Sequence, residues 1–162
     1  MDSFNAADTA GATAALLSLC ASSRWATSMS AARPFPDVDA VLDTSDAVFP
    51  HLVESDLREA LAGHPRIGDR VAGSDAGARL SRSEQASMAD ADGAVTAAIR
   101  EGNIDYEQRF DRVFLIRAAG RTPQQMLQEL QRRLRNDDTT ELAEVREQLR
   151  QITHLRLEGA LR

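Results

Sequence analysis

The stretch from Asp138 to Leu157 reads DTTELAEVREQLRQITHLRL, and it gives the clearest indication of fold in the chain. Four of its apolar residues recur at steps of three or four positions, the spacing of one α-helical face: Leu142, Val145, Leu149 and Ile152. The stretch therefore predicts a long helix that begins near Asp138 or Thr139 and buries this face.

Start and stop signals farther upstream predict that the rest of the chain is helical as well. Helices are expected at 10–21 after a cap at Asp8 or Thr9, around Trp25 and Met29, at 39–49, from a cap at Ser55 to a left-handed Gly63, at 81–100, at 104–110 after a break at Gly102-Asn103, and at 122–135. Residues 113–116 are β-branched and aromatic, and they are locally the most extended-looking stretch in the chain. The sequence predicts an all-α fold, a single-domain multi-helix bundle over residues 1–162.

Composition excludes several classes of function. The net charge of −6 argues against a general nucleic-acid binder, and no apolar run approaches the ~20 residues of a membrane span. All 19 cationic residues are arginine, so lysine Schiff-base chemistry is excluded. Cys20 is the single cysteine, and its apolar neighbours indicate a buried thiol. The N-terminus lacks the pattern of a signal peptide, and a cytoplasmic protein is expected.

His64 is the histidine in the most distinctive local setting. It lies between Gly63 and Pro65, and the residue before a proline is restricted to extended backbone. A histidine held at such a point can move a proton in both directions near neutral pH. It can equally cap the preceding helix through that helix's last carbonyls, and local sequence leaves both interpretations open. His51 and His154 are expected to have structural or surface roles.

Two charged residues also stand out. Glu84 closes the capping box Ser81-Arg82-Ser83-Glu84, so a structural task is expected, although the same helix end can hold a polar substrate. Arg156 is the next step of four after Ile152 on the apolar face of the last helix. A guanidinium there is costly to bury unless it meets an anion, but Leu155 can also carry the stripe onward with Arg156 at its flank.

Motifs along nearly the whole chain carry a resemblance to a known family. They include GHPRIG at 63–68, SRSEQ at 81–85, FLI at 114–116 and ITHLRL at 152–157. The motifs are specific in combination, although none is specific alone. On them the chain resembles the 2-oxo-4-hydroxy-4-carboxy-5-ureidoimidazoline (OHCU) decarboxylases, which complete the conversion of urate to (S)-allantoin.

The resemblance implies a role for each matching residue. His64, Glu84 and Arg156 match the catalytic histidine, a catalytic acidic residue and an active-site arginine of the family. The matching substrate-binding positions are Pro65, Ser81, Glu84, Gln85, Phe114, Leu115, Ile116, Arg117 and Ala118. The resemblance also implies an all-helical enzyme, often a homodimer, that uses no metal or organic cofactor. Its small-molecule substrate would be OHCU, with urate oxidase and hydroxyisourate hydrolase as pathway neighbours.

One departure keeps alternatives open. The family usually has glycine and then a small or apolar residue after its Arg-Phe pair, whereas this chain has Asp111-Arg112. Either a local Asp–Arg pair rebuilds the turn or the substrate edge of the pocket is altered. The alternatives are a related decarboxylase for another ureido acid and a non-catalytic helical module that binds a partner.

Overall fold

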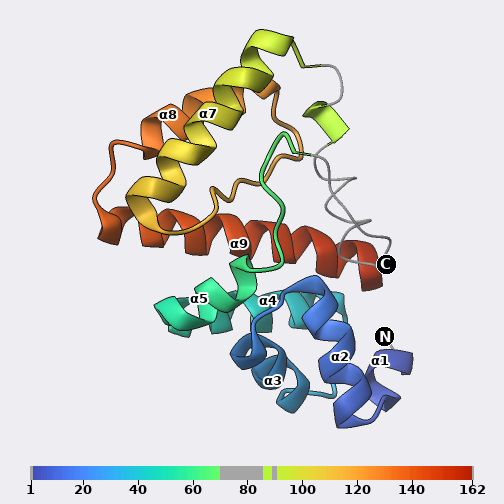
Figure 1. Ribbon diagram of the computed structural model, residues 1–162. Coiled ribbons are helices and arrows are strands. Elements are labelled where there is room, and N and C mark those ends of the chain that lie inside the picture. Colours follow the sequence, from blue (N-terminus) through green and yellow to red (C-terminus); the bar gives the residue numbers. More distant parts are fainter. Residues whose placement is uncertain (1, 70–85, 89–90, 162) are drawn as a thin grey trace. The chain divides into compact units, whose positions relative to one another are not determined.

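The computed structural model describes residues 2–69, 86–88 and 91–161, and every regular element within these ranges is helical (Figure 1). The α-helices are α1 (Asp2–Ala6), α2 (Thr9–Leu19), α3 (Ser23–Ala31), α4 (Val38–Val48), α5 (Glu54–Leu61), α7 (Gly93–Phe110), α8 (Pro123–Arg133) and α9 (Asp138–Leu161). The same ranges contain the short 3₁₀ helices η1 (Phe49–His51) and η2 (Ala86–Met88). The predicted all-α fold is confirmed. None of the described helices is both long and apolar enough to cross a membrane.

Contacts divide the chain into two compact units. The first comprises Met1–Gly63 with Arg150–Arg162, and the second comprises His64–Leu149. The boundary falls inside α9, so this helix supplies residues to both units.

The core of the first unit forms around Trp25 of α3. Its ring is fully buried, and its indole Nε1 donates a hydrogen bond of 3.0 Å to Ser45 Oγ on α4. Asp8 caps α2, as one of the two expected caps, because its carboxylate accepts from the Gly11 amide at 2.7 Å. Burial raises the pKa of the Cys20 thiol, as expected for a buried, unreactive cysteine.

The core of the second unit lies between α7, α8 and the segment that joins them. α7 and α8 lie side by side (Figure 1), and Gly102 of α7 packs closely against Leu130 of α8. A methyl group added at Gly102 would lie 2.6 Å from Leu130 Cδ2. The core cluster contains Ile67, Ile99, Tyr106, Phe110, Phe114, Ile116, Ala118, Met126 and Leu130.

The predicted helix break at Gly102-Asn103 is wrong. α7 runs unbroken through both residues, because Gly102 serves close packing and the buried Asn103 side chain donates to the Ile67 carbonyl at 3.0 Å. The prediction of one helix over 81–100 is also wrong for the residues of this range that the structure describes, 86–88 and 91–100. Residues 86–88 are 3₁₀, and α7 begins at Gly93, where the Asp92 carboxylate accepts from the Ala94 amide.

Both predicted boundaries of α5 need correction. Ser55 lies inside the helix, and the N-cap is Val53, whose amide donates to the Asp56 carboxylate at 2.9 Å. This acidic side chain in the first turn replaces the expected serine cap. Gly63 does not take the left-handed conformation expected of it; among the glycines described, Gly68 and Gly120 do. The predicted capping box at Thr122 and Gln125 is confirmed, with its two hydrogen bonds at 3.2 and 2.8 Å.

Candidate active site

His64 lies at the start of the second unit, where the chain is tied to α7 by the residues that follow. Arg66 forms a two-pronged ion pair with Glu107, with nitrogen–oxygen distances of 2.5 and 2.6 Å. Ile67 is buried in the core, and α7 holds its carbonyl. His64 and Pro65 are half-buried beside this anchored stretch. A fixed backbone and partial exposure suit a side chain that must meet a small molecule.

The segment 114–118 is non-helical, as predicted, and almost completely buried. Phe114, Leu115, Ile116 and Ala118 are 2–6% exposed. The segment ends in a turn in which the Arg121 amide donates to the Ala118 carbonyl at 3.0 Å, with the left-handed Gly120 inside the turn. A buried segment outside regular structure must find partners for its peptide groups elsewhere.

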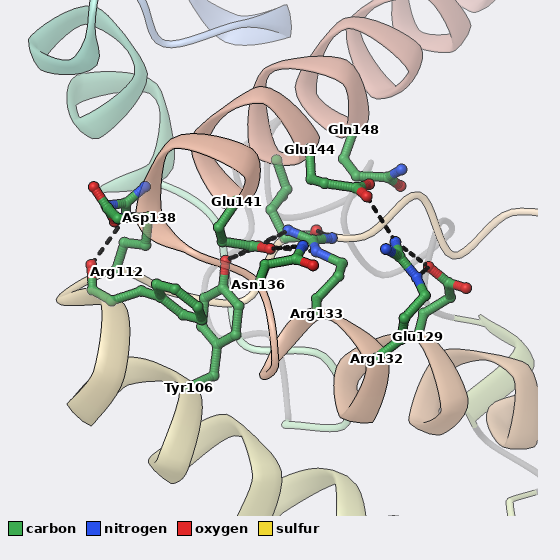
Figure 2. A network of polar contacts seen from close by, with 12 residues as sticks. Tyr106, Arg112, Glu129, Arg132, Arg133, Asn136, Asp138, Glu141, Glu144 and Gln148 are labelled. Carbon is green, nitrogen blue, oxygen red and sulfur yellow. Dashed lines mark hydrogen bonds and ion pairs between the residues drawn. The ribbon is translucent and has the colours of Figure 1, made fainter.

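A buried ion pair supplies one of these partners (Figure 2). Arg133, at the end of α8, is 1% exposed and lies 2.5 Å from the Glu141 carboxylate of α9, which is fully buried. The other terminal nitrogen of Arg133 donates to the Leu115 carbonyl at 2.7 Å. Its guanidinium also lies over the Phe114 ring, 4.7 Å from the centroid. The pair therefore holds both the backbone and a side chain of 114–118.

Two more residues complete the shell around Glu141. The Tyr106 hydroxyl donates to one carboxylate oxygen, and Asn136 Nδ2 donates to the other at 2.9 Å (Figure 2). Burial raises the pKa of Tyr106, so its hydroxyl stays protonated as a donor. The Tyr106 ring contacts Phe114 edge-on, with centroids 5.2 Å apart. Glu141 thus has its acceptor sites filled, which offsets the cost of burying its charge.

A second side chain holds the segment two residues farther on. Gln148 of α9 is 6% exposed, and its Oε1 accepts a hydrogen bond of 2.9 Å from the Arg117 amide. The carbonyl of Leu115 and the amide of Arg117 are therefore both bound by side chains. The described residues provide no partner for the peptide groups of Ile116 or for the amide of Ala118. Within the described ranges, protein groups thus bind part of the backbone of this segment: the Leu115 carbonyl, the Arg117 amide and the Ala118 carbonyl.

Asp111 and Arg112 form the turn that leads from α7 into this segment. Asp111 has φ 52° and ψ 37°, the left-handed conformation in which glycine is the usual residue, and its amide closes α7 on the Glu107 carbonyl. The Arg112 side chain is buried, donates to the Phe110 carbonyl at 2.9 Å and lies 2.5 Å from Asp138 at the start of α9 (Figure 2). Asp111 thus takes the left-handed backbone conformation usual for glycine, and Arg112 connects the turn to α9 through its ion pair with Asp138.

Arg156 belongs to the first unit. It is 6% exposed, and its Nη1 donates to the Leu19 carbonyl, at the end of α2, at 3.0 Å. Leu155 is less buried than Arg156, so the stripe of α9 continues to the arginine, the first of the two alternatives drawn from the spacing. His154 lies on the flank of the helix, with Nδ1 3.9 Å from Asp46 Oδ1, and His51 is exposed.

Ser81, Glu84 and Gln85 lie outside the described residues, so the convergence of His64, Glu84 and Arg156 stays a prediction. Within the ranges described, no three His, Cys, Asp or Glu side chains come together as metal ligands.

Comparisons with known proteins identify the family. The family model described as OHCU decarboxylase matches residues 5–158. The chain belongs to the OHCU decarboxylase family. The uric acid degradation bifunctional protein TTL of Arabidopsis thaliana is 33% identical over 141 residues, which are 85% of this chain and 44% of that protein. This chain therefore spans less than half of that relative.

Two solved structures are similar to this chain in fold. A crystal structure of OHCU decarboxylase in the presence of (S)-allantoin matches with a TM-score of 0.78 and 28% identity, over 91% of this chain and 96% of that one. A crystal structure of (S)-allantoin synthase matches with a TM-score of 0.73 over 99% of this chain and 53% of that one. At 14% identity the second likeness concerns the fold alone.

The two residues whose side chains bind the backbone of 114–118, Arg133 and Gln148, were not singled out by sequence reasoning. On α8, Met126, Leu130 and Arg133 follow one another at steps of four and three positions. On α9, Glu141, Val145 and Gln148 follow one another at the same steps. The criterion that found Arg156, a polar residue on an apolar helical stripe, would have found both.

Proposed function

We propose that this chain decarboxylates OHCU to (S)-allantoin in the degradation of uric acid. The observation that carries the proposal is the family match over residues 5–158, together with 33% identity to a protein of uric acid degradation. The likeness to a decarboxylase structure that was solved with (S)-allantoin supports the same reaction.

The chemistry of this reaction needs little beyond positioning. The substrate carries a hydroxyl and a carboxylate on one ring carbon, beside the carbon that bears the ureido group. When CO₂ leaves, its bonding electrons form a carbon–carbon double bond to the ureido-bearing carbon, and the ring C=N electrons move onto nitrogen, which takes a proton. The hydroxyl then becomes the ring carbonyl as it loses its proton, and the ureido-bearing carbon gains one. The substrate is thus its own electron sink, and we propose a reaction without metal or organic cofactor.

His64 is proposed as the acid–base residue that delivers the proton to carbon. Its half-buried place on an anchored segment supports this role, because a proton given from one fixed side produces one enantiomer. Delivery from solvent would give a racemate. The helix-cap alternative predicts no effect of His64 on handedness.

The other contacts follow the family pattern. The free peptide groups of 114–118 are proposed to bind ring and ureido groups, and Arg156 to bind an anionic or carbonyl oxygen. Pro65, Ser81, Glu84 and Gln85 are proposed to complete the pocket. Replacing Glu84 by glutamine separates its roles, because glutamine keeps the cap geometry without the charge. If activity and stability both stay unchanged, Glu84 is mainly a cap.

The decisive experiment supplies freshly made substrate, which is the product of urate oxidase and hydroxyisourate hydrolase acting in sequence. Allantoin should form faster than without the chain and in the S form, as followed by circular dichroism and chiral chromatography. Allantoin that forms no faster and stays racemic would refute the proposal and favour the helical interaction module. Turnover of a different ureido acid in preference to OHCU would favour the related decarboxylase.

A His64→Asn variant should fold like the wild type and lose about 10²–10⁴-fold in kcat, the usual contribution of a positioned acid–base group. A matched His51→Asn variant, changed at an exposed histidine, should keep full activity. Wild-type turnover by His64→Asn would remove His64 from the mechanism.

We further propose a homodimer in the cytoplasm, with the two urate-oxidising pathway enzymes as functional neighbours. Sedimentation equilibrium tests the oligomeric state, since a monomer and a dimer of a 17.7 kDa chain differ twofold in mass.

A further inference from the structure

Two buried side chains form hydrogen bonds with the segment 114–118 on the same edge of its backbone. Phe114, Ile116 and Ala118 pack in the core cluster of the second unit, whereas Leu115 and Arg117 lie outside it. This alternation is that of an extended chain. In an extended chain the C=O and N–H of one residue point to one edge, and those of the next residue point to the other. The Leu115 carbonyl and the Arg117 amide therefore share an edge.

Arg133 binds the first of these groups and Gln148 the second, at 2.7 and 2.9 Å. The opposite edge carries the amide and carbonyl of Ile116 and the amide of Ala118, for which the described residues offer no partner, and the Ala118 carbonyl, which accepts from the Arg121 amide at 3.0 Å. On the first edge the Leu115 amide and the Arg117 carbonyl also have no partner among the described residues. Buried peptide groups are paired with protein or water in nearly all native structures, so the three adjacent groups of Ile116 and Ala118 that lack a protein partner are available to a ligand. Because Arg133 and Gln148 fix the backbone through one edge, they also fix the position of the Ile116 and Ala118 peptide groups on the other edge.

The ion pair of Arg133 and Glu141, which holds this edge, costs free energy to bury. Arg133 and Glu141 are 1% and 0% exposed, and a buried ion pair frequently contributes less stability than apolar residues of the same volume. A neutral donor would suffice to satisfy the hydrogen bonding of the Leu115 carbonyl. A rigid, bidentate guanidinium, itself held by Glu141, sets the position of the carbonyl more tightly than a flexible neutral donor does.

We propose that Arg133 and Gln148 are positioning residues for the reaction: they hold one edge of 114–118 so that the Ile116 and Ala118 peptide groups meet the substrate. On this second edge the amides of Ile116 and Ala118 are donors, and the Ile116 carbonyl between them is an acceptor. The imidazoline ring and ureido group offer N–H and C=O groups in return, so the matching ligand is a cyclic ureide. This inference rests on the proposed function, and neither residue is proposed to touch the reacting atoms.

Gln148 allows the cleaner test because it carries no charge. Gln148→Met keeps the volume and removes the acceptor, whereas Gln148→Glu keeps an oxygen acceptor at the same place. Loss of one oriented contact should raise KM about tenfold in Gln148→Met with a smaller change in kcat, and Gln148→Glu should restore most of the affinity. The Arg117 amide should also exchange with solvent about tenfold faster in Gln148→Met, as measured by NMR.

Two controls separate positioning from stability. Ile99→Val trims the same core cluster without changing a residue of the segment or of its two side-chain partners, and it should lower Tm by about 3 °C with KM unchanged. Gln131→Met makes the same substitution at an exposed site on α8 and should change neither quantity. If Gln148→Met does not fold, Arg133→Lys serves instead: it keeps a cation beside Glu141 but loses the planar fork, and it should raise KM by a similar factor.

The outcomes distinguish this inference from the proposed function. If the wild-type chain does not accelerate (S)-allantoin formation, the proposed function fails and the inference fails with it. If the wild type is active and Gln148→Met matches it in KM and kcat, only the inference is overturned. A KM that rises equally in Ile99→Val and Gln148→Met overturns it as well, because the effect then follows stability.

Discussion

At Asp111 the backbone takes the left-handed conformation at the end of α7, with φ 52°. Left-handed backbone costs a residue with a Cβ roughly 1–2 kcal/mol, and aspartate tolerates it better than most. Asp111→Gly and Asp111→Ala remove the same carboxylate, so their difference isolates the backbone. We expect the glycine variant to be about 1 kcal/mol more stable than the alanine variant. Urea unfolding measures both.

The same pair of variants also tests the alternative drawn from the unusual dipeptide. If Asp111 serves only the turn, Asp111→Gly should turn over substrate like the wild type. A change in substrate preference would show that the carboxylate affects the pocket. Equal stability of the glycine and alanine variants would contradict the left-handed geometry.

At the scale of residues, sequence reasoning identified isolated polar groups better than networks. The burial of Cys20 followed from its apolar neighbours along the chain, and the burial of Arg156 is one of the two alternatives that the spacing of the last helix left open. The partners of Arg133 could not be predicted, because Glu141, Leu115 and Tyr106 lie eight, eighteen and twenty-seven positions away. Spacing on one helix indicates that a charge is buried, but only tertiary packing decides what it meets.

At the scale of elements, Gly102 couples α7 to α8. Alanine in a helix is about 1 kcal/mol more favourable than glycine, but the added methyl would clash with the fully buried Leu130. We expect Gly102→Ala to destabilise the wild type by about 1 kcal/mol, since overpacking outweighs helix propensity. In a Leu130→Ala background the clash is gone, and the same substitution should stabilise by about 1 kcal/mol.

This change of sign is measurable as a double-mutant cycle by urea unfolding. Stabilisation of the wild type by Gly102→Ala would mean that the two helices are not in such close contact. The error in predicting a break here has the same origin. Glycine inside a helical pattern can end a helix or admit a neighbouring one, and local sequence does not distinguish the two.

The start of α9 provides a prediction about pH. The Asp137 carboxylate accepts from the Thr140 amide at 2.8 Å and from its hydroxyl at 3.0 Å, and these hydrogen bonds lower the pKa of Asp137. A carboxyl whose pKa is lower in the folded state stabilises at pH values above its unfolded pKa of about 3.9, and it loses this contribution as the pH falls through the folded value.

The substitution Asp137→Asn removes the charge and approximates the protonated carboxyl, so this variant serves as the reference. The wild type should have the higher Tm at neutral pH, and the difference should shrink progressively below about pH 4. A difference in Tm that stays constant down to pH 2 would contradict a lowered pKa of Asp137.

At the scale of the whole molecule, the fold class could be predicted because helical periodicity and capping signals occur in nearly every element. The division of contacts into two units could not be predicted, because its boundary falls inside α9 and leaves the periodic pattern unbroken. The extended segment 113–116 was predicted from β-branched and aromatic residues alone. Its function as a held backbone edge depends on α8 and α9, which no local pattern connects to it.

Residues 5–158 should perform one reaction, although they resemble part of a bifunctional relative. The family match occupies residues 5–158 of the 162, and the chain corresponds to 44% of the bifunctional protein but to 96% of a solved OHCU decarboxylase. With urate and urate oxidase alone, the chain should leave the decay of the first oxidation product unchanged. When hydroxyisourate hydrolase is added, (S)-allantoin should appear at a rate proportional to the concentration of the chain. If the chain accelerates the first decay without the hydrolase, a second activity resides in these same residues.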